Sequence, residues 1–487
     1  MVMLLLIVIP VVTGLSCALI RSRRVMEWLN LLCAAALLAC AGMLAAHVLG
    51  QGTVTTLQGF LRADSLSAVV VLLTGFVALV VNVYSVGFMR REEVGGKIND
   101  TQFRRFYVLT PFFLGTMNLV PLVDNLGVMW VAMETSTLVS VMLVLFYNQK
   151  TSLEAAWKYI IIGSIGVSLA LFGTVITYYS AVGILGPDAG RGMDWSVLLP
   201  LAEKFDRYPM KLAFIFILLG YGTKAGLAPM HTWKPDAYAE VPVPSAALMG
   251  AAFVNCALYA IMRFYVLAEK CLGPVFPGNL LMFLGIGSML VAVPFIVVQR
   301  NFRRILAYSS IDHTGIMVAA LGFGGPLAVM LHMVFHAVTK PLMFFCAGNV
   351  QQHYDTPHFR KVTGVMKTLP WTGALFMIGT LAVTGTAPFS MFQSEYLALS
   401  AAVEHKHYWA AGLFLLAVVT IFAGFLTHMV RMNLGKPSSP VTTRKECPWK
   451  LTAMLMVLVP VLVLTFYLPA PLYELIQRAA KIVGGHP

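Results

Sequence analysis

The chain has 487 residues, of which 59% are hydrophobic and only 11% are charged. Because about a quarter of the residues in a soluble globular protein are charged, this composition excludes that class and predicts an all-α polytopic membrane protein. The net charge of +13 does not indicate nucleic-acid binding, since basic residues concentrate in the cytoplasmic loops of membrane proteins.

Apolar stretches long enough to cross a bilayer recur along the whole chain between polar breaks. The first resembles a signal sequence but has no basic residues before it, so we expect it to remain as a helix. No linker or low-complexity segment interrupts the series, which predicts one membrane domain over residues 1–487. The expected spans number fourteen and cover residues 2–20, 28–49, 64–88, 106–123, 125–147, 155–180, 209–230, 240–268, 278–299, 304–322, 326–350, 369–400, 406–431 and 449–475.

Lysine and arginine are distributed unevenly between the loops. Twenty-two of the 34 lie in or beside the loops after odd-numbered spans, and seven lie in or beside the loops after even-numbered spans. By the positive-inside rule the first set of loops is cytoplasmic, so both termini are expected on the non-cytoplasmic side. The longest non-cytoplasmic loop, at 181–211, is long enough for a short surface structure.

Two spans are interrupted by small residues and proline, span 7 in GTKAGLAPMHTW and span 12 in TGTAPFSMFQSEY. Proline removes a backbone donor and clashes with the preceding turn, so each helix should break inside the membrane. The breaks lie five spans apart, so spans 4–8 (residues 106–268) and spans 9–13 (278–431) would form two inverted five-helix repeats. Residues 1–105 would form three preceding helices, and residues 449–475 the last helix.

Lys224 lies inside span 7, where a charged side chain costs several kcal/mol unless it is paired or hydrated. Glu134 lies in the middle of span 5 and has no basic residue one turn away. We expect the two to face each other, because each charge then stabilises the other and a proton moved on one changes the other. The alternatives are a lysine that snorkels to the interface and a neutral glutamate bonded to a neighbouring helix.

Span 11 carries His332, His336 and Lys340 at positions i, i+4 and i+8, which share one helical face. Imidazoles titrate near neutral pH, so this stripe is best interpreted as a proton relay. An HxxxH pair is also found in zinc sites, but no carboxylate or cysteine ligand lies on the same face. Polar contacts that only hold helices together are the third interpretation.

Span 10 begins with Arg300, Arg303 and Arg304, which we expect at the cytoplasmic edge. Asp312 and His313 continue the polarity inward and are candidates for a proton access route, although serines in this span can simply bond back to the helix. In span order the polar groups lead from Glu134 and Lys224 through the stripe to Glu395 in span 12. This order predicts a lateral path through the membrane.

Together these motifs resemble the antiporter-like membrane subunits of complex I and of membrane-bound (group 4) hydrogenases. Within that superfamily the chain is most similar to the hydrogenase-4 component F group. The resemblance extends from span 5 to span 12 and rests on WVAMETSTL, TSLEAAWKYIII, GTKAGLAPMHTWKPDAYAEVPVPSAAL, RRILAYSSIDHTG, HMVFHAVTKPLMFFCAGN and APFSMFQSEY.

The resemblance implies fourteen helices, inverted repeats, the Glu134 and Lys224 pair, a central relay and a terminal charged residue, Glu395. It implies a subunit with no catalytic residue, cofactor, metal or redox centre of its own, which agrees with seven cysteines that lack any CxxC spacing. The expected partners are other antiporter-like and small membrane subunits, redox subunits with iron-sulfur clusters and a NiFe or quinone site, and lipids. The expected location is the inner (cytoplasmic) membrane of a bacterial or archaeal cell.

The chain departs from the family pattern at two positions. Complex I members commonly have a lysine in span 8 where this chain has Asn255, which can orient water but cannot carry a proton. The usual HTWLPDA becomes HTWKPDA, which puts Lys234 at an expected cytoplasmic edge beside His231, a further candidate for access or water orientation.

The leading interpretation is a proton-translocating subunit that couples electron transfer in its neighbours to ion pumping. Two alternatives remain, a subunit of a cation/proton antiporter complex with no redox partner and a passive membrane anchor.

Overall fold

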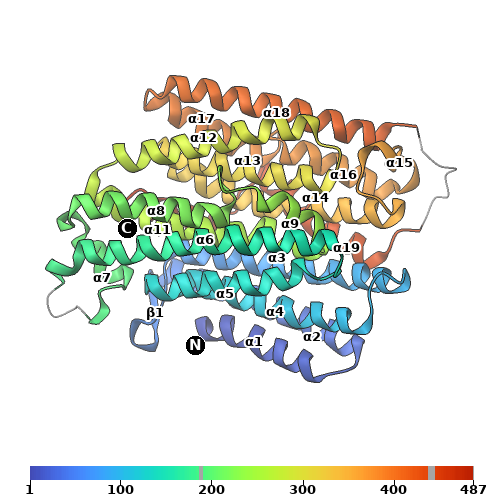
Figure 1. The fold of residues 1–487 in the computed structure, drawn as a ribbon, viewed down its shortest axis with the longest axis horizontal. Coiled ribbons are helices and arrows are strands. Elements are labelled where there is room, and N and C mark those ends of the chain that lie inside the picture. The colour runs from blue at the N-terminus through green and yellow to red at the C-terminus, as the bar shows by residue number, and fades with distance from the viewer. Residues whose placement is uncertain (186–189, 437–444, 486–487) are drawn as a thin grey trace.

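The computed structural model describes residues 1–185, 190–436 and 445–485, and nearly all of them are helical. The helices lie side by side in one bundle, with α1 and α2 along one edge and α18 along the opposite edge (Figure 1). Both termini lie toward the same end of the helices as β1 and α7 (Figure 1).

The N-terminal part contains three long helices and one short hairpin. The hairpin pairs β1 (Val54–Thr56) with β2 (Leu61–Ala63) in antiparallel register around a 3-10 turn. The helices are α1 (Val2–Leu19), α2 (Arg23–Gln51) and α3 (Ser65–Val94).

The next part of the chain runs from α4 to α11 and contains the first break. Its elements are α4 (Asp100–Leu122), α5 (Leu126–Val144), α6 (Lys150–Ala181), α7 (Trp195–Leu201), α8 (Arg207–Ala225), α9 (Trp233–Glu240), α10 (Val243–Leu248), the π-helical turn η5 (Met249–Phe253) and α11 (Val254–Leu272). The long loop expected at 181–211 thus holds α7, while residues 186–189 of that loop lie outside the described part.

The C-terminal half contains the second break and ends in a short helix. Its elements are α12 (Val275–Val298), α13 (Phe302–Gly322), α14 (Pro326–Tyr354), α15 (Val365–Thr368), α16 (Pro370–Val383), α17 (Ser390–Glu404), α18 (Tyr408–Leu434), α19 (Pro448–Phe466) and α20 (Ala470–Val483).

Ten of the described helices, the α10–α11 stretch counting as one, are long and apolar enough to cross a membrane. Three more, α4, α8 and α13, have at least 19 residues but carry more polar side chains. The fold is therefore that of a polytopic all-α membrane protein. The number of fourteen crossings and the inverted repeats stay predictions.

The centre of the bundle is built from α11, α14 and α3. The most apolar 18-residue segments of these spans are 100%, 94% and 83% buried, against 33% for α1, α18 and α19. A polar group on α14 is thus enclosed by protein, whereas most residues in the apolar segments of α1, α18 and α19 are not buried.

Both breaks predicted from proline are present. In the first, α8 ends at Ala225, and Gly226 adopts the left-handed conformation (φ 85°) that glycine tolerates best. In the second, α16 ends at Val383 and Gly385 has φ 62°. Each break contains a cis peptide bond before proline, Ala228–Pro229 and Ala387–Pro388.

Close contacts join α6 to α8, the helix that ends at the first break. Gly173 and Gly220 lie where α6 crosses α8, and a Cβ on Gly173 would be 2.8 Å from the carbonyl oxygen of Ala213. Small residues let two membrane helices approach closely. As a result α6 and α8 are in direct backbone contact.

The expected last helix at 449–475 was wrong in extent. The structure ends α19 at Phe466 and begins a separate helix, α20, after Pro469. The prolines at 469 and 471 explain the interruption, since proline fits the first turn of a helix but not its interior. α20 is amphipathic and packs its apolar side on α3 and α14.

Candidate functional site

Lys224 lies in the last turn of α8, directly before the break, and none of its surface is exposed. Its ammonium donates a hydrogen bond to Oγ1 of Thr137 on α5 and lies 3.9 Å from Oε2 of Glu134. Gly163 of α6 leaves room for the ammonium, because a Cβ there would be 3.1 Å from Nζ. The predicted Glu134 and Lys224 contact is thus present in the geometry.

The two members of this pair differ in exposure. The Glu134 side chain is 26% exposed, and its neighbours on the outer face of α5, Val131 and Leu138, are also exposed. The distance of 3.9 Å allows attraction between the charges but exceeds the length of a hydrogen bond. The lysine is therefore enclosed, while the glutamate lies at the edge of the bundle.

Side chains from α9 donate hydrogen bonds to the free carbonyl oxygens at the end of α8. Nε1 of Trp233 donates to the carbonyl oxygen of Thr223 at 2.9 Å, and Nζ of Lys234 donates to that of Ala225 at 2.7 Å. Opened carbonyls inside a membrane need such donors. Lys234 itself is completely buried against the end of α8.

The predicted stripe on α14 faces α13. Nζ of Lys340 donates to Oγ of Ser309 at 2.8 Å. Nε2 of His332 lies 3.2 Å from Nδ1 of His313, and its Nδ1 lies 2.9 Å from Oγ of Ser394. The structure thus links α13, α14 and α17 through one imidazole.

His336 occupies the middle of the stripe and is fully buried. Its ring centre lies 5.1 Å from that of His313, and neither ring nitrogen has a hydrogen-bond partner among the described residues. A buried polar atom without a hydrogen-bond partner destabilises the fold. Such groups occur where they have a function, and proton exchange is one such function. His336 is thus the least constrained imidazole of the three.

Asp312 and Glu395 approach the stripe from α13 and α17. They line one small pocket together with Ser309 and His313. Glu395 packs against the backbone of the second break at Gly385 and also borders a cavity of about 310 Å³ between α17 and α18. Glu395 is thus adjacent to both the central groups and a cavity at the side of the bundle.

The two remaining predicted residues are Asn255 and His231. Asn255 follows the π-helical turn η5, and its amide donates to the carbonyl oxygen of Ala251 at 2.9 Å while Oδ1 has no partner in the described chain. His231 lies in the turn between α8 and α9, and Nδ1 of its ring also lacks a partner there. Both side chains retain a free position for a proton donor or acceptor.

Arg303, one of the three arginines at the start of α13, is buried. It donates to the carbonyl oxygens of Tyr238 and Val241 at the end of α9. Arg304 instead forms an ion pair with Asp236 at 2.6 Å. These two arginines therefore hold α9 against α13.

Some polar groups that complete the site were missed from the sequence. Thr137 lies three residues after Glu134, a spacing that places both on one helical face, so this partner of Lys224 could have been found. Ser394 directly precedes Glu395, but its bond to α14 depends on helix packing and has no sequence signal.

A second buried ion pair lies at the β-hairpin end of the bundle. Nη2 of Arg263 donates to Oδ1 of Asp64 at 2.7 Å, and the guanidinium stacks 4.4 Å from the ring of Trp195. Burial raises the pKa of Asp64, but Arg263 and Arg62 outweigh that effect and leave the pKa below its ordinary value. We interpret this pair as structural, since it is remote from both breaks in sequence.

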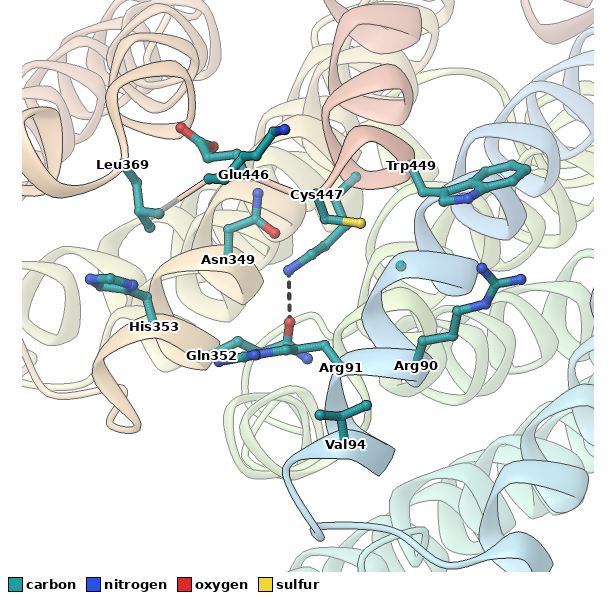
Figure 2. Close-up of a pocket in the computed structure, with 13 residues that line it drawn as sticks. Arg90, Arg91, Val94, Asn349, Gln352, His353, Leu369, Glu446, Cys447 and Trp449 are labelled. Carbon is teal, nitrogen blue, oxygen red and sulfur yellow. Dashed lines mark hydrogen bonds between the residues drawn. The ribbon is translucent and has the colours of Figure 1, made fainter. Parts of the chain in front are cut away.

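Figure 2 shows a pocket of about 320 Å³ between α3, α14 and α19. Lys450 donates to Oε1 of Gln352 across it at 2.8 Å, and Arg90, Arg91 and Lys445 add further positive charge. None of the residues singled out from the sequence lines this pocket. In the described part of the chain, no three His, Cys, Asp or Glu side chains gather as metal ligands.

Two family models match the chain and cover most of the site. The model described as NADH:quinone oxidoreductase/Mrp antiporter, TM, matches residues 123–421. The model described as NADH-Ubiquinone oxidoreductase (complex I), chain 5 N-terminus, matches residues 56–107.

Individual relatives extend these matches. The chain is 37% identical over 391 residues to the hydrogenase-4 component F homolog of Methylacidiphilum infernorum, covering 78% of this chain and 81% of that relative. It is 27% identical over 386 residues to a Na(+)/H(+) antiporter subunit of Alkalihalophilus pseudofirmus, covering 77% and 75%. A chain of the membrane-bound sulfane sulfur reductase, an archaeal respiratory membrane complex, shares the fold with a TM-score of 0.88 at 21% identity over 99% of this chain and 97% of that one.

Proposed function

We propose that this chain translocates protons. It belongs to the NADH:quinone oxidoreductase/Mrp antiporter family and is an antiporter-like membrane subunit. Its structural relatives are parts of multi-subunit membrane complexes. We propose further that electron transfer in neighbouring subunits of a hydrogenase-type or complex I-like assembly drives the translocation.

The observation that carries this proposal is the series of buried titratable groups across the middle of the bundle. The series begins at the ion pair of Lys224 and Glu134, continues through α13 and α14, and reaches α17 through the bond from His332 to Ser394. Ionisable residues inside a membrane bundle are expensive and usually mark ion pathways. The proposed proton-carrying groups are Glu134, Lys224, His332, His336, Lys340 and Glu395, with Asp312, His313, His231 and Asn255 in access or water-orienting roles.

The energy scale of the first pair suits this function. Moving one elementary charge across 100 mV takes about 2.3 kcal/mol, and one unit of pKa corresponds to about 1.4 kcal/mol. Lengthening or shortening the 3.9 Å contact between Glu134 and Lys224 changes the electrostatic energy between the two side chains. A movement at this contact is therefore matched to the work of pumping.

We propose that the complex resides in the cytoplasmic membrane of a bacterium or archaeon with both termini on the non-cytoplasmic side. The distribution of Lys and Arg supports this orientation, and the two termini lie at one end of the helices (Figure 1). The exposed apolar faces of α5 and α6 are suited to lipid or to a further membrane subunit; they include Val131, Leu138, Leu153, Trp157 and Ile161.

Replacing Lys224 with alanine tests the proposed function. Everted membrane vesicles that carry the intact complex are energised with its electron donor, hydrogen or NADH, and proton uptake is followed with a fluorescent ΔpH probe. K224A is expected to abolish uptake by this complex while part of the electron-transfer rate remains. Unchanged proton uptake per electron in K224A would rule out the proposed mechanism.

The similarity to a component of a Na(+)/H(+) antiporter supports a second candidate, cation/proton exchange without electron transfer. An imposed pH gradient distinguishes the two in the same vesicles. Dissipation of that gradient on addition of sodium, with no electron donor present, would favour exchange. A passive anchor, in contrast, would keep transport when the buried charged residues are replaced together by apolar ones.

A further inference from the structure

Lys234 is a buried lysine outside the series of proposed proton-carrying groups. It lies in the first turn of α9 and has no exposed surface, yet it forms no ion pair with a carboxylate in the described part of the chain. A buried ammonium without a counter-ion is strongly destabilising unless it loses its proton for part of the time. Its environment is therefore that of a group that changes protonation state.

The contacts of Lys234 leave most of its hydrogen-bonding capacity unused. Nζ donates to the carbonyl oxygen of Ala225, and an ammonium has two further donors. The ring of Tyr238 lies 5.7 Å away, and Oγ1 of Thr314 on α13 approaches the same carbonyl at 3.4 Å. The amine is thus enclosed by aromatic and hydroxyl groups rather than by a charge partner.

Lys234 lies between the two parts of the proposed path. On one side it binds the residue next to Lys224, and Gly226 is in such close contact that a Cβ there would be 2.9 Å from Nζ. On the other side, Oγ1 of Thr314 approaches the same carbonyl oxygen, and Thr314 directly follows His313, whose ring centre lies 5.1 Å from that of His336 on α14. In the described residues, Lys224 and the stripe are not themselves joined by a direct hydrogen bond.

We propose that Lys234 is a proton carrier that joins Lys224 to His336 and Lys340, an inference that rests on the proposed function. The ammonium of Lys224 gives a proton to the neutral amine of Lys234, and Lys234 then gives a proton to the imidazole of His336 or the amine of Lys340. Each transfer breaks one N–H bond and forms another. Bridging water carries the proton where the nitrogens are more than a hydrogen bond apart.

A purely structural role for Lys234 predicts that different substitutions are tolerated. If Lys234 only caps the carbonyl of Ala225, a neutral donor such as glutamine suffices. If it supplies a fixed positive charge, arginine suffices, because arginine keeps its proton in proteins. A proton carrier tolerates neither substitution.

The test compares K234Q and K234R in the intact complex, using the same everted vesicles and ΔpH probe. We expect both to lower proton uptake per electron by at least about tenfold, the scale of losing one acid–base group. K204Q, at an exposed lysine of the α7 loop region, is the matched control and is expected to retain uptake. Retained uptake in K234Q or in K234R would overturn the proposal.

Electron-transfer rate and the amount of intact complex report assembly. If one variant fails to assemble, proton uptake in the other variant tests the proposal. If both fail, proton uptake is measured in K234M, whose side chain has a similar volume. K224A separates this inference from the proposed function. Loss of uptake in K224A with retained uptake in the Lys234 variants would refute only the inference, whereas retained uptake in K224A would refute the proposed function.

Discussion

His332 on α14 and Ser394 on α17 are hydrogen-bonded, with 2.9 Å between Nδ1 of the imidazole and Oγ of the serine. The other ring nitrogen of His332 faces His313 on α13 at 3.2 Å. One side chain therefore joins three helices, and its contact on α17 is the residue that directly precedes Glu395. Lys340 shares this helical face, and its ammonium donates a hydrogen bond to Ser309 of α13.

Ser394→Ala should weaken this connection without removing a titratable group. The variant leaves Nδ1 of His332 without its partner, and an unsatisfied buried polar atom costs about 1–3 kcal/mol, so we expect proton uptake to fall about tenfold. Uptake per electron in everted vesicles measures the effect. Ser394→Thr keeps the hydroxyl and should retain most of the activity, and an S394A rate equal to the parent rate would show that the bond is dispensable.

Gly163→Ala tests the space around Lys224. The added Cβ would lie 3.1 Å from Nζ and displace the ammonium by a few tenths of an ångström. Because the contact with Glu134 is already long, we expect uptake to fall about threefold to tenfold. Gly42→Ala is the matched control, since a Cβ at Gly42 meets no atom within 4 Å. Equal effects of G163A and G42A would contradict the prediction.

Glu395→Gln removes the terminal carboxyl group but keeps the shape of the side chain. If Glu395 carries protons, uptake should fall by at least about tenfold while electron transfer continues in part. Glu404→Gln, at an exposed position of the same helix α17, provides the comparison and should behave like the parent. A normal uptake rate in E395Q would place the end of the path elsewhere.

The Asp64 and Arg263 pair predicts acid sensitivity of the fold. The pKa of Asp64 is held below its ordinary value, so its contribution to stability is complete above about pH 4, the pKa of an unfolded aspartate, and is lost as the pH falls through the lowered folded pKa. Thermal unfolding of the detergent-solubilised protein should therefore occur at lower temperature below about pH 4.

Asp64→Asn should lower stability by about 3–5 kcal/mol at pH 7, because it leaves the buried Arg263 charge without its partner. The variant should also lose the part of the acid sensitivity that comes from this carboxylate. The double variant D64N/R263Q is expected to be less destabilised than the sum of the single variants. Strictly additive effects would show that the pair does not interact.

Several features of the site followed from the sequence because they have local physical causes. A lysine in an apolar span requires a partner, and Glu134 is the carboxylate found at 3.9 Å from it. Proline and glycine within a span required the two breaks, which end α8 at Ala225 and α16 at Val383. The spacing of four residues placed His332 and His336 on one buried face.

Other features depend on how helices lie against one another, which the sequence does not encode locally. Lys234 follows the first break in the sequence, but the chain turns back and returns the side chain to Ala225. The bond between His332 and Ser394 likewise joins the stripe to the α17 segment that holds Glu395. No residue spacing in the sequence predicts either of these contacts.

The glycine contacts between α6 and α8 have a consequence for how the Glu134 and Lys224 pair responds to its surroundings. The backbones of α6 and α8 are in contact at Gly173 and Gly220, so Lys224 lies on a closely packed pair of helices. Glu134 belongs to α5, whose outer face is open. A subunit that packs against this outer face of α5 would therefore act on the pair through Glu134 rather than through Lys224.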